Sequence, residues 1–203
     1  MADEQTQAPR RLRIDTALNA TEKGDPFLLI KVHGVEDFSQ PYKYEISMLR
    51  ELSKPRIDPA DLINTIAKIG VRISELKFFQ IPIIRTEIDI PGEVGHSFIT
   101  RFGVFESVTD EGITDDNEDF RTYSAVVVPA FKMLDREIIF RVFEKKNVRD
   151  IIREVTRDFP NLAVNQSRLD QEKSDAFPIM EYCVQFRESS FNFLSRLMAQ
   201  FGI

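Results

Sequence analysis

The sequence predicts an α+β fold, in which an antiparallel β-barrel-like domain is followed by an α/β segment. In the first two thirds of the chain, short segments alternate apolar and polar residues, as half-buried strands do. Strands that follow each other this closely favour antiparallel pairing. Beyond Pro129, two stretches instead repeat apolar residues at intervals of three and four, which indicates two amphipathic helices.

The composition is that of a soluble globular protein, and it argues against one class of partner. Of the 203 residues, 42% are hydrophobic and 30% are charged, which is enough for one domain or two small ones. Lys and Arg number 27 against 33 Asp and Glu, so the net charge is −6. Nucleic-acid binding rests on a basic surface that neutralises phosphates, and we therefore expect no nucleic-acid partner.

The cysteine content and the lengths of the apolar runs indicate the cellular compartment in which the protein folds. Cys183 is the single cysteine, so no intramolecular disulfide can form and a reducing compartment is expected. The N-terminus lacks an apolar run of signal-peptide length, and no segment approaches the roughly 18 apolar residues of a membrane span. We expect assembly in the cytoplasm, no stable membrane insertion, and export, where it occurs, by a route without a cleaved leader.

The N-terminal part of the chain divides into an arm and a β-rich domain. Residues 1–24 are polar and without a sustained period, which predicts a flexible arm. Residues 25–130 are predicted to form the first β-barrel-like domain. Pro82 cannot donate to a sheet ladder, so the segment around it is expected to be an edge or bent strand. Pro59 is well placed to begin a short helical turn. The other predicted strands are 27–34, 42–49, 69–73, 98–105 and 122–129.

The acidic segment 106–119 allows two interpretations. A calcium loop is one, because three of its residues have one-three-five spacing, namely Asp115, Asn117 and Asp119. Phe120 then stands where such a loop requires glycine, and Val126 stands where it requires a bidentate glutamate. A solvated hairpin loop is therefore favoured, and we expect no metal site.

Residues 131–203 are predicted to form the α+β segment. The run 138–142 alternates as a short strand, and a helix begins at Asn147 and stops at Pro160. Residues 162–177 are irregular and are expected to form a connector. The apolar face of the predicted helix consists of Val148, Ile151, Ile152, Val155 and Phe159.

The last stretch, 181–203, changes its period halfway. Its first half alternates as a half-buried strand does, with Tyr182, Val184 and Phe186 on one side and Cys183, Gln185 and Arg187 on the other. Ser189 and Ser190 can accept hydrogen bonds from the first turn of a helix, and Gly202 can end it in a left-handed conformation. The predicted apolar face of this helix consists of Phe191, Leu194, Leu197, Met198 and Phe201.

Four blocks of residues carry a more specific signal than periodicity. They are Gly34, Glu36, Phe38, Ser39, Pro41 and Tyr42; then Arg101, Phe102, Gly103 and Val104; then Val128, Pro129, Leu134, Arg141, Phe143, Val148, Asp150, Ile151 and Ile152; and finally Gln185, Phe186, Arg187, Glu188, Ser189, Phe193, Leu194, Ser195, Arg196, Leu197, Gly202 and Ile203. In order and spacing they resemble the N-terminal hub region of VgrG proteins, the trimeric spikes of bacterial type VI secretion systems.

The resemblance implies the phage tail hub fold and a structural role. It implies a homotrimer in the full-length protein, whose paired barrels present a pseudo-sixfold face to a hexameric, Hcp-like secretion-tube ring. Spike tip and effector proteins are further implied partners, and delivery into a target cell is the implied fate. Residues 25–130 would then be the first hub domain. Residues 131–203 would be the α+β segment of the second hub domain, truncated before its barrel.

Other functions stay open beside this one. A tail hub of a contractile bacteriophage shares the fold, and a small ligand-binding β module would instead have an apolar pocket. An enzyme acting on cell-wall polymers has thin support, because His33 and His96 are the only histidines and no GxSxG or phosphate loop occurs. We assign no catalytic, cofactor-binding or metal-binding residues and expect no cofactor. Glu188 is the acid to follow, and we expect it to accept backbone N–H groups at the helix start.

Overall fold

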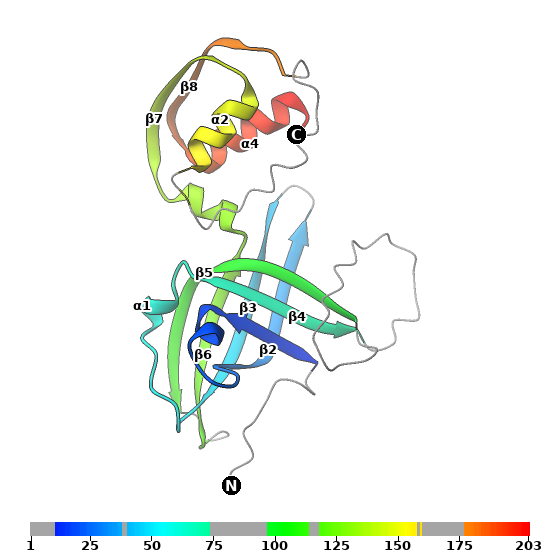
Figure 1. Ribbon diagram of the computed structural model, residues 1–203, viewed down its shortest axis with the longest axis vertical. Coiled ribbons are helices and arrows are strands. Elements are labelled where there is room, and N and C mark those ends of the chain that lie inside the picture. Colours follow the sequence, from blue (N-terminus) through cyan, green and yellow to red (C-terminus); the bar gives the residue numbers. More distant parts are fainter. Residues whose placement is uncertain (1–10, 38–39, 74–96, 114–117, 158, 160–176) are drawn as a thin grey trace. The chain divides into compact units, whose positions relative to one another are not determined.

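The computed structural model describes residues 11–37, 40–73, 97–113, 118–157, 159 and 177–203 (Figure 1). The chain divides into two compact units, Met1–Pro129 and Ala130–Ile203, and each has its own hydrophobic core. The first unit is built on a curled antiparallel sheet. In its described residues, the second unit combines two strands with two helices.

The strands described in the first unit form a six-stranded antiparallel sheet that curls into a half barrel (Figure 1). The strand order is β1-β4-β5-β6-β3-β2, and the two strands at the ends of this order also contact each other. The predicted α+β class with a barrel-like first part is therefore confirmed. The strands are β1 (Leu12–Thr16), β2 (Leu28–Asp37), β3 (Gln40–Glu51), β4 (Ile66–Ile73), β5 (Ser97–Ile113) and β6 (Phe120–Val128).

The core of this unit lies on one face of the sheet because apolar residues alternate along the central strands. Tyr123, Ala125 and Val127 of β6 are buried, whereas Ser124 between them is only half-buried. The Tyr123 hydroxyl accepts the N–H of Ile57 at 3.3 Å and donates to the carbonyl of Ile57 at 3.2 Å. The polar atom of this buried ring is thus satisfied, as burial of tyrosine requires.

Two short helical turns lie between strands in the described part of the first unit. The 3₁₀ turn η1 (Ala17–Ala20) follows β1, and α1 (Pro59–Leu62) precedes β4. The Asp58 side chain accepts the N–H of Ala60 at 3.0 Å and so caps α1. The helical turn predicted from Pro59 is therefore confirmed.

Part of the predicted flexible arm is folded, so the prediction is wrong for residues 12–20. Strand β1 pairs antiparallel with β4, from Leu12 opposite Val71 to Thr16 opposite Ala67. The physical reason is burial, because Ile14 is 1% exposed and belongs to the core. A five-residue strand needs only one or two inward apolar side chains, too few to give a visible period. Residues 1–10 lie outside the described residues.

The predicted solvated loop at 106–119 is also wrong over most of its length, because β5 continues to Ile113. Two register shifts against β6 mark bulges, which let a long strand bend with the curled sheet. Asp110 lies on this strand with a side chain that is only 7% exposed. Residues 114–117, which include part of the rejected calcium loop, lie outside the described residues, as does the strand predicted around Pro82.

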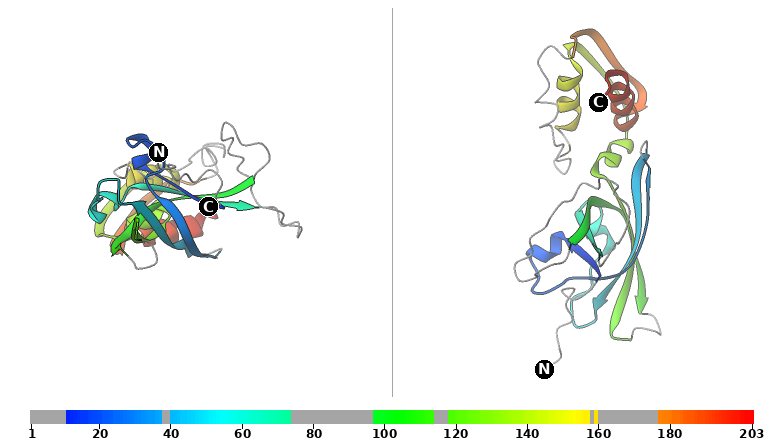
Figure 2. Two further views of the ribbon diagram at one scale, coloured as in Figure 1. Left: turned by 90° about the horizontal axis from the view of Figure 1, so that it is seen from below. Right: turned by 90° about the vertical axis from the view of Figure 1, so that its right-hand side faces the viewer.

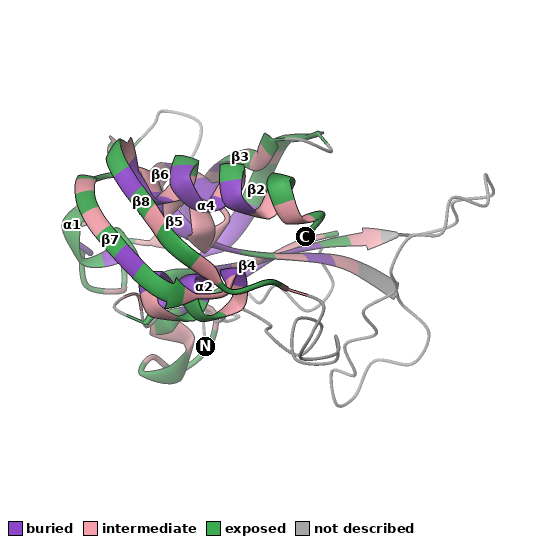
Figure 3. Cartoon of the chain, turned by 90° about the horizontal axis from the view of Figure 1, so that it is seen from above, coloured by how far each residue is buried: buried purple, intermediate pink, exposed green. Residues whose placement is uncertain are grey.

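The described residues of the second unit form five elements. Strands β7 and β8 pair antiparallel, and both helices pack against the same face of this two-stranded sheet (Figures 1 and 3). The first helix ends before Phe159, one turn earlier than predicted, and residues 160–176 lie outside the described residues. The elements are η2 (Ala130–Asp135), β7 (Ile138–Lys146), α2 (Val148–Thr156), β8 (Met180–Ser189) and α4 (Ser190–Phe201).

Both helices begin at the residues that the sequence predicted. The Asn147 side chain accepts the N–H of Asp150 at 2.9 Å, and the Ser189 hydroxyl accepts the N–H of Asn192 at 3.2 Å. Gly202 ends α4 in the left-handed conformation, with φ at 69°. Within the described part of the chain, no helix is long and apolar enough to cross a bilayer.

Candidate functional site

Some of the residues that carry the resemblance lie close together where β2, β3 and β5 meet. They are Gly34 and Glu36 of the first block and Arg101 of the second. Arg101 binds the Glu36 carboxylate twice, at 2.6 Å from Nε to Oε1 and at 3.0 Å from Nη2 to Oε2. The Tyr44 hydroxyl donates to the same carboxylate. The Tyr44 ring lies so close to Gly34 that a Cβ at this position would collide with it. The cluster therefore joins three strands of the sheet.

The charge states in this cluster are fixed near neutral pH. The hydrogen bond from Arg101 is the main reason why the pKa of Glu36 lies below its ordinary value. Burial, followed by the hydrogen bond to Glu36, raises the pKa of Tyr44. The hydrogen bond to Glu36 also raises the pKa of Arg101. General acid–base catalysis favours a group that titrates near the working pH, and none of these three does so.

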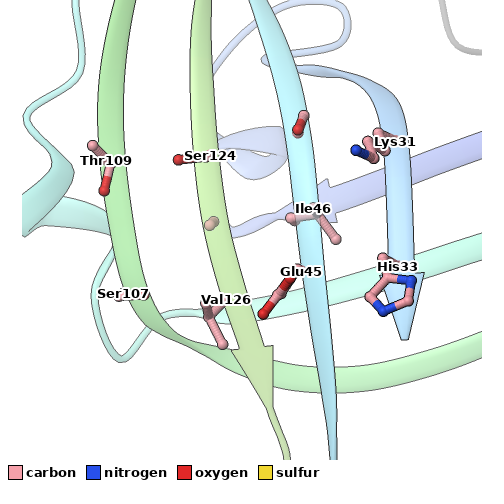
Figure 4. Close-up of a pocket in the computed structure, with 10 residues that line it drawn as sticks. Lys31, His33, Glu45, Ile46, Ser107, Thr109, Ser124 and Val126 are labelled. Carbon is pink, nitrogen blue, oxygen red and sulfur yellow. The ribbon is translucent and has the colours of Figure 1, made fainter. Parts of the chain in front are cut away.

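A polar groove of about 510 Å³ crosses four strands on the sheet face opposite the core (Figure 4). Its side chains form two rows that follow the strand register, one of Lys31, Ser47, Ser124 and Thr109, and one of His33, Glu45, Val126 and Ser107. Hydroxyl and charged groups line this groove together with Ile46, Ala125 and Val126, and it is open to solvent. It is not the enclosed apolar pocket that a small ligand-binding module predicts.

The histidines do not assemble a metal centre in the part of the chain that the structure describes. His33 lies on β2 in the groove, and His96 lies outside the described residues. Within the described ranges, no three or more His, Cys, Asp and Glu side chains are grouped to hold a metal ion. The groove therefore offers polar contacts and charge but no recognisable metal chemistry.

Glu188 lies at the junction of β8 and α4, and its predicted role is wrong. Its carboxylate binds the Arg196 guanidinium, with 2.6 Å between Oε1 and Nη2, and the helix N–H group is capped by Ser189 instead. The side chain of Arg196 reaches back from the second turn of α4 to do this. The carboxylate thus fastens the helix to the end of the strand, which is a structural task.

The neighbouring serine connects α4 to η2. The Ser189 hydroxyl donates to Asp135 Oδ1 at 2.6 Å, and Lys132 Nζ lies 2.6 Å from Asp135 Oδ2. The hydrogen bond from Lys132, then that from Ser189, lowers the pKa of Asp135. The rings of Phe131 and Phe191 pack 5.1 Å apart beside these groups. The hydrogen bond between Ser189 and Asp135 therefore connects the start of α4 to η2.

The side of β8 that is buried differs from the expectation for the last strand. The alternation in β8 is as predicted, but its apolar side is exposed, while Gln185 is buried against the helices. The Gln185 amide donates to the Glu188 carbonyl at 3.0 Å and accepts from Arg141 at 3.3 Å. The exposed side chains, here called the apolar face, are Ile138, Phe140 and Val142 of β7 and Tyr182, Val184 and Phe186 of β8.

The sequence contained one signal for this surface. β7 carries apolar residues on both sides, with Phe143 buried against the helices and Phe140 and Val142 on the other side. A strand that is apolar on both faces is typical of a sheet covered on both faces. In the second unit, the described helices cover only one of them. Periodicity alone did not show that the apolar side of β8 is the exposed one.

Comparisons with known proteins agree with this architecture. Residues 35–203 match the family described as phage tail baseplate hub (GPD). The chain is 27% identical over 197 residues to the type VI secretion system spike protein VgrG1b of Pseudomonas aeruginosa. It is 39% identical over 84 residues, or 41% of its length, to the spike protein VgrG1c of the same organism.

A solved structure shows the same fold. It is that of the E. coli c3393 protein, described as a component of the type VI secretion system with structural similarity to the T4 bacteriophage tail proteins gp27 and gp5. The TM-score is 0.58 at 16% identity, over 93% of this chain and 43% of that one. The matched region spans 22% of VgrG1b and 11% of VgrG1c, so the relatives are several times longer.

Proposed function

Because the chain belongs to the phage tail baseplate hub (GPD) family, we propose that it is a structural hub subunit of a type VI secretion spike. The observation that carries the proposal is that the family match runs through both units, from residue 35 to residue 203. The matched curated relatives are named as spike proteins of this secretion system. A fold alone would not support this function, but fold and sequence together do.

In this proposal three copies assemble around one axis and cap a hexameric tube ring. The assembly is built in the cytoplasm and is then delivered, with a spike tip and effector proteins, out of the cell or into a target cell. Residues 25–130 supply the first hub barrel, and residues 131–203 begin the second hub domain. The curled sheet of the first unit is the kind of rigid element on which such a ring contact can be built.

The proposed role needs no reaction, and the carboxylates that stand out are already engaged. Glu36 is held by Arg101, and Glu188 is held by Arg196. A general acid or nucleophile must reach a substrate, whereas these two groups connect elements of the fold. We therefore propose that the chain acts by assembly and not by catalysis.

Gene deletion in the source bacterium tests the role in secretion. We expect the tube protein to disappear from the culture medium while its level inside the cells is unchanged, and the wild-type gene to restore it. A Glu188→Gln variant should restore secretion as well, because no hydrolysis is required. Unchanged secretion after deletion, or a hydrolytic activity that a folded Glu188→Gln variant has lost, would contradict the proposal.

Light scattering tests the assembly directly. We expect three copies per particle for the full-length protein, and a larger particle when rings of the tube protein from the same organism are added. A monomeric protein that does not bind the tube rings and turns over a substrate would show that the hub interpretation is wrong.

The tail hub of a contractile bacteriophage is the second candidate. It is favoured by one observation, namely that the similar c3393 structure is itself described as similar to T4 tail proteins. The reading frame beyond Ile203 in the source genome separates the two. A needle of repeats there indicates a secretion spike, and a lysozyme-like domain indicates a phage hub.

A further inference from the structure

Three arginines lie on the sheet of the first unit where β1, β4 and β5 are neighbours in the strand order. Figure 2 gives two further views of this sheet, with β1 in dark blue and β5 in green. Ile69 of β4 belongs to the core, so the residues that alternate with it face outward. Arg13 is paired with Gly70, and the Arg72 N–H donates to the Arg11 carbonyl at 2.7 Å. The three outward arginines are here called the basic patch.

The charges of the basic patch are unfavourable for folding by themselves. Arg11 and Arg72 lie directly opposite each other, and like charges in this position destabilise a pair of strands. In the described part of the chain, neither guanidinium makes an ion pair. β1, β4 and residues 97–105 of β5 contain one acid, Asp15, and it binds Lys68 at 3.3 Å. These strands therefore supply no carboxylate that neutralises Arg11 and Arg72.

Two buried polar atoms in the same place have no hydrogen-bond partner. They are Nε of Arg72 and Oγ1 of Thr100. Thr100 lies on β5 opposite Gly70, in one row with Arg13, and it is only 6% exposed. Buried polar groups are nearly always hydrogen-bonded, and a bound ion or ligand is one reason for an exception. Together with the positive charge, these two atoms favour an anionic ligand.

The spacing and surroundings of the basic patch favour carboxylates on an extended peptide. Arg72 and Gly70 alternate along β4 about 7 Å apart, which is also the spacing of alternate residues in any extended segment. Guanidinium groups bind carboxylates through two parallel hydrogen bonds. Further along the same face, Ile66 and Phe102 are 50% and 56% exposed and can contact apolar side chains. A nucleic acid requires a broader basic surface than this one.

We propose that the basic patch binds an extended acidic segment of a partner protein, with carboxylates on alternate residues. One carboxylate bridges Arg11 and Arg72 and so removes their repulsion. The next lies over Gly70, where it accepts the Thr100 hydroxyl, and Arg13 adds positive charge beside it. The inference goes beyond the proposed hub function, because it rests on the charge and burial of this surface.

Fluorescence anisotropy of the full-length protein with a labelled peptide of alternating glutamate and threonine tests the proposal. We expect binding that weakens as the salt concentration rises from about 0.05 to about 0.3 M, because salt screens exposed charges. The same peptide with glutamine in place of glutamate should not bind. A single-stranded oligonucleotide of equal charge should bind more weakly than the acidic peptide. Equal or tighter binding of the oligonucleotide would overturn the choice of a peptide ligand.

Two substitutions separate a binding role from a structural one. Arg72→Gln and Thr100→Val should each weaken peptide binding by at least about threefold, because each removes a hydrogen bond to a charged group. Neither should lower the urea midpoint, since one removes like-charge repulsion and the other removes a buried hydroxyl without a partner. Arg136→Gln is the control, because it makes the same charge change at an exposed arginine of the second unit. A lower midpoint with unchanged binding would overturn the inference.

The chain's own acids are the alternative source of carboxylates. Glu87 and Asp89 also alternate in the sequence. Binding that is seen only after Glu87→Gln and Asp89→Asn would show that the chain itself supplies the carboxylates, and the proposed partner would be wrong.

The outcomes also separate this inference from the proposed function. Loss of secretion after gene deletion, together with a peptide that does not bind, overturns only the inference. Normal secretion after deletion, together with binding that Arg72→Gln weakens, overturns only the hub function.

Discussion

Arg50 is a buried cation on β3 that joins three separate stretches of the first unit. Its side chain is 1% exposed, and its Nη2 lies 2.8 Å from Glu22 Oε1. The guanidinium also donates to the carbonyls of Pro55 and Pro26, at 2.8 and 3.0 Å. Burial of a charge is tolerated only when it is paired and fully hydrogen-bonded, and Arg50 meets this condition.

We predict that Arg50→Met lowers the free energy of unfolding by about 3 kcal/mol, because it leaves a carboxylate and two carbonyls without their donor. Urea denaturation measures this change. Arg101→Met is the control, since its ion pair with Glu36 is 34% and 45% exposed. It should cost only about 1 kcal/mol or less. Equal losses at the two sites would contradict the importance of burial.

Asp110 should make the first unit sensitive to acid. Burial alone raises the pKa of Asp110, but hydrogen bonds from Arg121, from the Gly112 N–H and from Arg56 outweigh it, so the pKa lies below its ordinary value. A carboxyl whose pKa is lower in the folded than in the unfolded state stabilises the fold above the unfolded pKa. This contribution is lost as the pH falls through the folded pKa.

We therefore predict that the urea midpoint of the wild type falls as the pH decreases from about 5 to about 3, on either side of the pKa near 3.9 of a free Asp. Asp110→Asn should be less stable at pH 7 and should depend less on pH in this window. Denaturation at several pH values measures both effects. A variant with the full acid sensitivity of the wild type would rule out Asp110 as the source.

At the scale of the element, α4 depends on Ser189. This hydroxyl accepts the N–H of Asn192 and donates to Asp135, so one side chain caps the helix and fixes it to η2. We predict that Ser189→Ala costs about 1 to 2 kcal/mol, from the lost cap and the lost hydrogen bond. Thermal denaturation followed by circular dichroism measures this loss.

Two substitutions at the same position separate the cap from the link to η2. Ser189→Thr keeps both hydrogen-bonding roles and should be close to the wild type. Ser189→Asp keeps a good capping residue but places a second carboxylate beside Asp135, so it should not restore stability. Full rescue by aspartate would show that only the cap matters.

The elements with a strong local signal were predictable, and those that depend on tertiary contacts were not. Asn147, Ser189 and Gly202 mark helix ends through their own hydrogen bonds or backbone conformation, so sequence alone located them. β1 was missed because its order comes from pairing with β4 and from burial of Ile14. Pairing between distant segments leaves little trace in local periodicity.

The candidate surfaces were harder to predict for a related reason. Alternation assigns Tyr182 and Gln185 to opposite sides of β8, but it does not say which side meets the helices. The structure buries Gln185 because Arg141 and the Glu188 carbonyl satisfy its amide. The resemblance to spike proteins predicted an assembly and a fold, whereas the identity of the exposed face of β8 became clear only from the packing of α2 and α4.

At the scale of the whole molecule, the two units have separate cores. Met48 lies in the core of the first unit and Leu194 in that of the second, and both are 0% exposed. The chain has no tryptophan, so tyrosine fluorescence is observable, and three of the four tyrosines lie in the first unit. Cys183, the single cysteine, lies in the second unit, where burial raises the pKa of its thiol and slows its reaction with labels.

We predict that each unit unfolds according to its own core, because a unit with a complete core can open without the other. Leu194→Ala should lower the stability of the second unit by about 2 to 5 kcal/mol and speed the labelling of Cys183, while the tyrosine transition stays where it is. Met48→Ala should shift the tyrosine transition and leave the labelling rate unchanged. Thiol labelling and tyrosine fluorescence, recorded on the same samples in increasing urea, measure both. If both substitutions move both probes equally, the chain unfolds as one cooperative body, and the two cores stabilise each other more than their separate packing implies.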